Sequence, residues 1–224
     1  MNIKELDRLE DSNVRILVDL KEYDVKKDTR LLIPFFYYQH YGLMNRGGEV
    51  VVGPQYDRIL DSCYRDSDLI RVGLHYTYGF SRSTKEPSTY LRTKWGLLDC
   101  NGKVILDTNY KSIGISDDKK VLTLQHMDGQ YEVINVDGEV IVPKGTYQWV
   151  DCFDSGLSRV HHYDGESKKY GIIDVRGNII LPIIYSRIWN FYKRNRHSTT
   201  IESIDEHGNK RVGIFDFITR KATI

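Results

Sequence analysis

A short motif that recurs five times along the chain constrains its fold more than any other feature. Each copy has an aromatic residue or valine, then in four copies a glycine, two apolar residues, and aspartate or asparagine. The five copies are Tyr41-Gly42-Leu43-Met44-Asn45, Trp95-Gly96-Leu97-Leu98-Asp99, Tyr131-Glu132-Val133-Ile134-Asn135, Tyr170-Gly171-Ile172-Ile173-Asp174 and Val212-Gly213-Ile214-Phe215-Asp216. Their start-to-start spacings of 54, 36, 39 and 42 residues indicate a unit of about forty residues, with an insertion in the first copy.

The rest of each unit repeats as well. A glycine, three aliphatic residues and a tyrosine follow the motif in the first four copies, and one inserted residue delays the tyrosine in the third. Together with the leading aromatic residues, these positions form the structural repeat: Tyr41, Gly48, Tyr56, Trp95, Gly102, Tyr110, Tyr131, Gly138, Tyr147, Tyr170, Gly177 and Tyr185. Two apolar runs separated by a dipeptide ending in glycine predict a β-hairpin with a type I′ turn. The aspartate or asparagine before the dipeptide is expected to accept hydrogen bonds from the turn backbone.

A further apolar segment precedes each hairpin, at residues 31–36, 69–74, 121–124, 157–160 and 199–204. Each unit is therefore predicted to hold three strands and a turn centred on the tyrosine. Because strand side chains alternate between faces, consecutive aliphatic residues make both faces of a hairpin apolar. Such a unit cannot fold alone and must stack on its neighbours. The sequence predicts an all-β protein built of about five degenerate tandem hairpin units.

These residues resemble the WG-repeat (KWG) proteins of bacteria, whose unit begins Lys-Trp-Gly and continues Leu/Ile-Ile-Asp, a turn glycine, aliphatic residues, proline and Tyr-Asp. Residues 94–99 match this pattern closely, as do residues 170–174 with Pro182 and Tyr185, and residues 54–57. Glu132 replaces the motif glycine in the third copy, and the fifth copy lacks the turn glycine. The resemblance spans about residues 31–224 and implies an all-β repeat structure. It implies no shared activity or catalytic residues, so it supports only an expectation of binding.

The two ends of the chain differ from the middle. Residues 212–224 hold only the opening hairpin of a unit, whereas residues 14–18 followed by Tyr23-Asp24 resemble the closing half. These halves could cap an open, curved array or pair to close a propeller-like ring, and the uneven spacing favours the open array. Ile3, Leu6 and Leu9 are spaced as in a short helix. We expect an N-terminal cap over residues 1–30 and one continuous repeat domain over residues 31–224.

Charge, cysteine content and motifs disfavour several classes of function. Lys and Arg number 32 against 31 Asp and Glu, so no global charge attracts nucleic acid or an anionic membrane. No apolar run is long enough to cross a membrane, and three widely spaced cysteines fit a reducing cytoplasm. Common metal, nucleotide and nucleophile motifs are absent from the sequence. We therefore predict a cytoplasmic, non-enzymatic protein with no catalytic residue, cofactor or metal ion.

The neighbouring residues His161 and His162, with Asp154 and Asp164, form the one group that suggests a metal site. Adjacent strand residues point to opposite faces, so the two imidazoles are not expected to converge. The leading aromatic residues are likewise expected to pack between units rather than to stack on a ligand.

Two segments interrupt the repeat and are the candidate binding surfaces. The first, residues 75–92, is rich in tyrosine, phenylalanine and arginine, although a polar loop or an extended hairpin explains it equally well. The second, residues 191–197, is a basic cluster that a solvated loop also explains. The candidate partner-binding residues are Tyr76, Tyr78, Phe80, Arg82, Tyr90, Arg92, Tyr192, Lys193, Arg194 and Arg196. The leading hypothesis is a protein-interaction scaffold, in one form an immunity or antitoxin-type protein; the alternative is a small-molecule or glycan binder.

Overall fold

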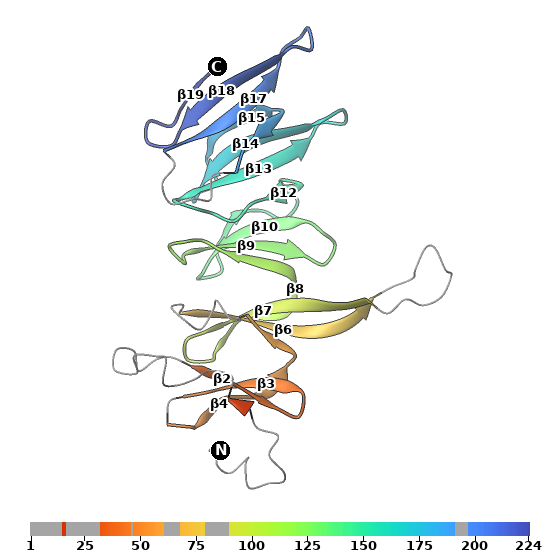
Figure 1. Ribbon diagram of the computed structural model, residues 1–224, viewed down its shortest axis with the longest axis vertical. Helices are drawn as coiled ribbons and strands as arrows, with labels where there is room; N and C mark the ends of the chain where they lie inside the picture. The colour runs from red at the N-terminus through yellow and green to blue at the C-terminus, as the bar shows by residue number, and fades with distance from the viewer. Residues whose placement is uncertain (1–14, 17–31, 46, 61–67, 79–89, 191–196) are drawn as a thin grey trace, which may run out of the picture. The chain divides into compact units, whose positions relative to one another are not determined.

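The computed structural model describes residues 15–16, 32–45, 47–60, 68–78, 90–190 and 197–224. These residues form β-strands, turns and loops, with no helix among them, so the all-β prediction is confirmed (Figure 1). The strands are β1 (Arg15–Ile16), β2 (Ile33–Tyr37), β3 (His40–Met44), β4 (Val50–Tyr56), β5 (Arg58–Ile59), β6 (Leu69–Tyr78), β7 (Tyr90–Asp99), β8 (Val104–Ile115), β9 (Val121–His126), β10 (Tyr131–Asn135), β11 (Val140–Val142), β12 (Trp149–Val150), β13 (Leu157–Tyr163), β14 (Lys168–Asp174), β15 (Ile179–Tyr185), β16 (Arg187–Ile188), β17 (Ser198–Ile204), β18 (Lys210–Asp216) and β19 (Lys221–Thr223). The predicted helix at the N-terminus and the Tyr23-Asp24 segment lie outside the described residues.

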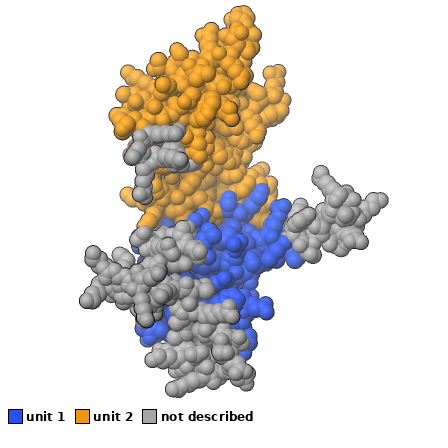
Figure 2. All heavy atoms as spheres, viewed as in Figure 1, with its two compact units in different colours: residues 1–112 blue, residues 113–224 orange. Residues whose placement is uncertain are grey.

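The strands form antiparallel meanders of four, which we call sheets 1 to 5: β1–β4, β5–β8, β8–β11, β12–β15 and β16–β19. Sheets 2 and 3 share β8, so their hydrogen bonds form one seven-stranded order. The chain divides into two compact units, residues 1–112 and 113–224 (Figure 2). Sheets 1 and 2 belong to the first unit, and sheets 3 to 5 to the second, with β8 contributing to both.

The tyrosine that follows the three aliphatic residues of a unit marks the point where the chain passes from one sheet to the next. Tyr56 ends β4, where it pairs with Tyr41, and the two residues of β5 then pair with β6. In the same way Tyr185 pairs with Tyr170, and Arg187 then pairs with Glu202 of β17. The expected turn is thus a short strand that opens the next sheet, which gives four strands per sheet rather than three.

This arrangement corrects the prediction of half repeats at the two ends. Arg15 and Ile16 pair with β2, just as β5 pairs with β6, so β1 is an opening strand and not the closing half of a unit. The last sheet also has four strands, because β19 closes it against β18. No unpaired halves remain to close a ring, and neither unit forms a barrel or a propeller in the part that the structure describes.

The hairpin turns after the motif are alike, but the prediction that they are of type I′ is wrong. In the second copy, Gly102 has φ of 80° and donates its N–H to the carbonyl oxygen of Asp99 at 3.0 Å. Asn101 has no positive φ, whereas a type I′ turn needs two such residues. The turn is therefore of type I, followed by glycine in a bulge, and the glycines at 48, 138 and 177 have φ of 81°, 90° and 80° in the same setting. As expected, Asp99 Oδ1 accepts hydrogen bonds from the N–H groups of Asn101 and Lys103, both at 2.8 Å.

The glycine of the motif is required by the closing strand. A Cβ atom at Gly96 would lie 2.7 Å from the carbonyl oxygen of Leu106, at the point where the register of β7 and β8 shifts. In the third copy the closing strand β11 ends at Val142. Beyond it, the backbone N–H of Gly145 donates to the carbonyl oxygen of Tyr131. Gly145 lies in the segment that the inserted residue lengthens. Thus, in the copy where Glu132 replaces the motif glycine, the closing strand β11 leaves the sheet after only three residues.

The cores lie between successive sheets, as the stacking argument predicts. Sheet 1 packs on sheet 2 through a cluster that includes Leu43, Val52, Val72 and Leu98. Sheet 3 packs on sheet 4 in the same way, and sheet 4 packs on sheet 5 around Ile172. Among the repeat tyrosines, those at 56, 147 and 185 are only 5–9% exposed and belong to these clusters. Their role is packing between sheets, not display to a ligand.

Candidate functional site

Of the candidate partner-binding residues, the structure describes the side chains of Tyr76 and Arg92. These two are cross-strand partners in β6 and β7, and Tyr78 and Tyr90 pair two residues further along the same hairpin. The side chains of Tyr78 and Tyr90 lie outside what the structure describes, as do the residues Phe80, Arg82, Tyr192, Lys193, Arg194 and Arg196. The structure therefore brings together one part of the first candidate segment and does not test the second.

The first segment is an extended hairpin. Strands β6 and β7 have ten residues each, whereas the hairpin strands at the same place in the other sheets have five to seven. The additional pairs run from His75 opposite Thr93 to Tyr78 opposite Tyr90. We call residues 75–78 and 90–93 the arm. Tyrosine and threonine favour extended backbone, which explains why the insertion lengthens the hairpin here.

One face of the arm is cationic and aromatic. Tyr76 and Arg92 share this face by register, and Lys94 lies next to them on β7. The Lys94 ammonium nitrogen is 5.3 Å from the centre of the Tyr76 ring, within the range of a cation–π contact. Arg92 is exposed, so this face presents a guanidinium beside a half-buried phenol ring. Such a pair is well suited to contact an acidic surface.

The opposite face of the arm borders a cavity in the first unit. This arm-base cavity has a volume of about 830 Å³ and is lined by Tyr41, Asp57, Arg58, Ile59, Leu60, His75 and Leu91. Leu91 is 64% exposed and presents an apolar side chain at the edge of the cavity. The cavity therefore combines aliphatic walls with an arginine and a histidine.

Asp57 is fixed in the arm-base cavity by its neighbours. One carboxylate oxygen lies 3.1 Å from His40 Nδ1, and the other accepts the backbone N–H of His75 at 2.6 Å. The backbone N–H of Asp57 donates to the carbonyl of Gly73 at 2.9 Å. With these contacts the carboxylate supports the base of the arm. The candidate segment at residues 75–92 included His75 and Leu91 without naming them as partner-binding residues. Sequence reasoning did not single out His40 or Asp57, although the Tyr-Asp pair of the repeat was a signal for Asp57.

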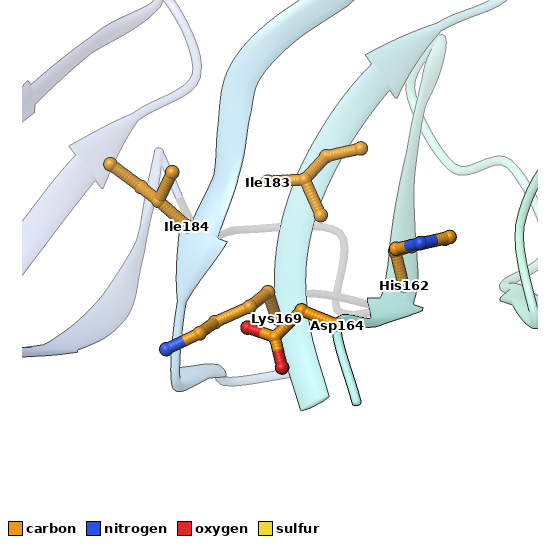
Figure 3. A pocket seen from close by; sticks show the side chains of 5 residues that line it. All are labelled: His162, Asp164, Lys169, Ile183 and Ile184. Carbon is orange, nitrogen blue, oxygen red and sulfur yellow. The ribbon is translucent and has the colours of Figure 1, made fainter. Parts of the chain in front are cut away.

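A second cavity lies in the second unit, on β13, β14 and β15 (Figure 3). Its volume is about 450 Å³, and its lining residues are His162, Asp164, Lys169, Ile183 and Ile184. The backbone N–H groups of Ser167 and Glu166 donate to the Asp164 carboxylate and hold its pKa below the ordinary value. Lys169 is the one cation of this lining, beside two isoleucine side chains, so the cavity is mainly aliphatic with a polar rim (Figure 3).

The two adjacent histidines point apart, as expected from strand geometry. His161 stacks on Trp149 at 5.6 Å between ring centres and meets Tyr170 edge-on at 5.4 Å. Burial, followed by the charge of Lys168, lowers the pKa of His161. His162 instead lines the second cavity. Within the described ranges, no three His, Cys, Asp or Glu residues are grouped so that they could hold a metal ion, and no helix there could span a membrane.

Comparison with known proteins identifies the repeat. The family model described as "WG containing repeat" matches residues 41–73, 133–161 and 170–195. No curated protein matches the sequence.

Two solved structures are similar over 86% of this chain, at 11% sequence identity. The tricorn protease has a TM-score of 0.36, and this chain covers 25% of its length. A puromycin hydrolase mutant complexed with PGG has a TM-score of 0.32, with 42% of its length covered. At these values the two hydrolases provide no argument about function.

Proposed function

Because three stretches of the chain match the WG containing repeat, we propose that it is a non-enzymatic scaffold that binds a protein partner through the arm and the arm-base cavity. The observation that supports this proposal is the lengthened β6–β7 hairpin, which departs from the repeat by ten-residue strands and borders a cavity of about 830 Å³. Departures from a scaffold's own pattern are where binding surfaces are commonly found.

The side chains of the arm-base cavity define the kind of partner that fits. Arg58 provides a cation on the same face of the arm as Leu91, while the nearby Asp57 carboxylate is already bound by His40 and by the backbone of His75. Leu91 provides an exposed apolar side chain beside Ile59 and Leu60 of the cavity. The proposed partner therefore presents an apolar side chain flanked by an acidic residue.

An immunity or antitoxin-type protein is the concrete form of this proposal, and its partner would be a toxin with an acidic surface. The proposal places this binding in the cytoplasm and expects neither a membrane nor a nucleic acid as partner. It also assigns no catalytic role to any residue of the chain.

A matched pair of substitutions tests the arm. We expect Leu91→Asp to abolish capture of a partner from lysate of the source cells, because it places a carboxylate in the apolar part of the contact. Val140→Asp is the control, since Val140 is 55% exposed on β11 and lies in the other unit. Captured proteins are quantified by mass spectrometry, and the binding of the recovered partner is then measured by calorimetry. Equal recovery by both variants and the original protein would remove the arm from the proposal.

A second candidate, a small-molecule or glycan binder, is favoured by the size of the two cavities. Volumes of about 830 Å³ and 450 Å³ lie in the usual range for ligand pockets, about 300–1,000 Å³. The repeat tyrosines at 56, 147 and 185 are too buried to stack on a sugar, so such a ligand would contact the cavities instead. Fluorescence of tyrosine and tryptophan, titrated with a panel of sugars and nucleotides, tests this candidate. A signal that stays constant across the panel would count against it.

A further inference from the structure

The second cavity lies where a core face of sheet 4 reaches the turn between β13 and β14. His162 and Lys169 are cross-strand partners, so their side chains lie on the same face of the sheet. Val160 and Gly171 form the next pair on that face, and Val160 is 0% exposed in the core cluster between sheets 3 and 4. The polar end of the cavity is therefore continuous with an apolar core face.

Gly171 determines the aliphatic wall of the cavity. A Cβ atom at this position would lie 2.6 Å from Cγ1 of Ile183, so the missing side chain allows Ile183 of β15 to lie over β14. Ile183 also packs against the core cluster, whereas Ile184 is 58% exposed. The strand register shifts at Gly171, and this bulge explains why two residues that are adjacent in sequence line one cavity.

Lys169 and Asp164 give the cavity one charge of each sign. Oδ1 of Asp164 accepts the backbone N–H groups of Glu166 and Ser167 at 3.0 and 2.9 Å, so the turn fixes the carboxylate. The charge of Lys169 adds to the effect of the Ser167 and Glu166 N–H groups in lowering the pKa of Asp164, so the two charges lie near each other. Among the residues that the structure describes, none forms an ion pair with Lys169 or Asp164. The half-buried ammonium of Lys169 and the second carboxylate oxygen of Asp164 are therefore available to a ligand.

The two signs of charge determine which class of ligand fits. An anion such as phosphate or a fatty acid would be attracted by Lys169 and repelled by Asp164, and a cation would meet the reverse. A zwitterion with an aliphatic side chain satisfies all parts of the lining. Its carboxylate pairs with Lys169, its ammonium pairs with Asp164, and its side chain packs against the two isoleucines. Figure 3 shows Lys169 and Asp164 on the same side of the cavity.

We propose that the second cavity binds a free α-amino acid with an aliphatic side chain, such as leucine. Its volume of about 450 Å³ lies within the range of small-ligand pockets, about 300–1,000 Å³. His162 at the rim can donate or accept a further hydrogen bond, because an imidazole ring has both kinds of nitrogen.

This inference rests on the second candidate function only in placing a small ligand in a cavity. The sugars and nucleotides of the fluorescence panel are not aliphatic zwitterions. A constant signal across that panel and a failure of leucine to bind are therefore separate results. The site lies in the second unit and includes no residue of the arm, so the protein partner proposed for the arm is tested independently.

A chemical-shift titration of the isotope-labelled full chain with L-leucine tests the site. We expect a Kd on the order of 0.1–1 mM for a ligand of this size in an open cavity. Three further probes each lack one part of leucine: N-acetyl-leucine lacks the ammonium, leucinamide lacks the carboxylate, and glycine lacks the side chain. Each should bind at least about tenfold more weakly, because contacts to charged groups and burial of an aliphatic side chain contribute this much.

Substitutions in the cavity should match the probes. We expect Lys169→Met to weaken leucine binding by about tenfold and not to weaken leucinamide, which has no carboxylate to be paired. Asp164→Asn keeps an Oδ1 acceptor for the turn, and it should weaken leucine but not N-acetyl-leucine. Lys168→Met is the matched control, since Lys168 is exposed and pairs with Tyr163 on the opposite face of sheet 4. This control should bind leucine like the original protein, and thermal melts followed by circular dichroism establish that all three variants fold.

Two results would overturn this inference. The first is an original protein whose spectrum does not change with leucine at about 10 mM, roughly tenfold above the weakest expected Kd. The second is binding that does not depend on the charges of the cavity, so that Lys169→Met and Asp164→Asn bind leucine as tightly as Lys168→Met does.

Discussion

At Gly96 and its equivalents, the absence of one methyl group allows the closing strand to approach the motif strand. An added Cβ at Gly96 would meet the Leu106 carbonyl oxygen at 2.7 Å and the Thr108 backbone nitrogen at 2.9 Å. Gly171 has the same setting, with the Leu181 carbonyl oxygen at 2.7 Å. Backbone atoms cannot turn aside as a flexible side chain can, so alanine at these positions forces the bulge open.

We expect Gly96→Ala to lower the free energy of unfolding by about 1–3 kcal/mol, the usual cost of overpacking. The reverse change at the exceptional copy, Glu132→Gly, should cost less, about 0.5–1 kcal/mol from glycine in a strand, together with loss of the 2.9 Å contact to His126. Urea unfolding of both variants measures the two costs. Equal losses would show that the close approach of the closing strand is not what selects glycine.

The turn carboxylates predict how stability depends on pH. The backbone N–H groups of Asn209 and His207 and the Asn209 side chain hold the pKa of Asp205 below its ordinary value, with the Asn209 backbone contributing most. Because the pKa is lower in the folded state, this turn adds stability above the ordinary carboxyl pKa of about 4. That stability is lost as the pH falls through the lower, folded-state pKa.

Replacement of Asp205 by asparagine should remove this pH dependence while keeping the turn. Asn135 occupies the same place in another type I turn, where its Oδ1 accepts the N–H groups of Asp137 and Glu139. We therefore expect Asp205→Asn to unfold at nearly the original urea concentration at about pH 7, and to lose less stability than the original at about pH 3. Asp205→Ala is the control, because it loses the acceptor at both pH values. An identical loss for the original and Asp205→Asn would contradict the role of the carboxylate.

At the level of elements, strand positions and hairpin partners could be predicted because apolar runs and glycines recur, but the turn type and the partner of the first strand could not. The sequence places glycine at 102 without saying whether Asn101 also takes a positive φ, and only the structure distinguishes the two turns. The four residues after Val14 have the composition of a closing strand, yet Arg15 and Ile16 pair with β2 as an opening strand. Composition determines that a segment is a strand, whereas its partner depends on contacts distant in sequence. The composition of residues 75–92 likewise fits either a loop or an extended hairpin, because it does not show whether the two halves of the segment pair.

Arg159 links sheet 4 to the opening strand of sheet 5. Its Nε donates to the Asp151 carboxylate at 3.0 Å, and its Nη1 donates to the carbonyl oxygen of Ile188 at 2.9 Å. Both charged side chains are nearly buried, with 14% and 15% exposed. A pair with so little exposure is costly to break, because the remaining carboxylate is left without its partner.

We expect Arg159→Ala to destabilise the protein by on the order of 3 kcal/mol, and Arg159→Lys to recover only part of this loss because an ammonium cannot form the same fork. Arg211→Ala is the control: its pair with Asp205 is 3.4 Å long and 65% exposed on the arginine side, so it should cost less than about 1 kcal/mol. Urea unfolding gives the three values. A loss for Arg159→Ala as small as that for Arg211→Ala would show that the sheets do not depend on this link.

On the scale of the molecule, the sequence correctly predicted that the sheets stack, because consecutive aliphatic residues make both faces apolar. It could not predict that Ile214 is 54% exposed, since Ile214 matches the motif as well as its fully buried counterparts Leu43, Leu97, Val133 and Ile172 do. Whether a motif residue is buried depends on a neighbouring sheet and not on its own side chain. The sequence could therefore predict that aliphatic motif residues form the core clusters, but not which of these residues are exposed.

Shared cores imply that damage to one sheet spreads to the next. Ile201 of sheet 5 is 0% exposed and lies in one cluster with Ile172 and Leu181 of sheet 4. We expect Ile201→Ala to cost about 2–5 kcal/mol and to reduce hydrogen-exchange protection in β14 and β15 as well as in β17 and β18. Ile204→Ala is the control on the same strand, because Ile204 is 48% exposed and should change stability by less than about 0.5 kcal/mol. Protection lost from sheet 5 alone would mean that the sheets fold as independent units, since stacked units that need each other must open together.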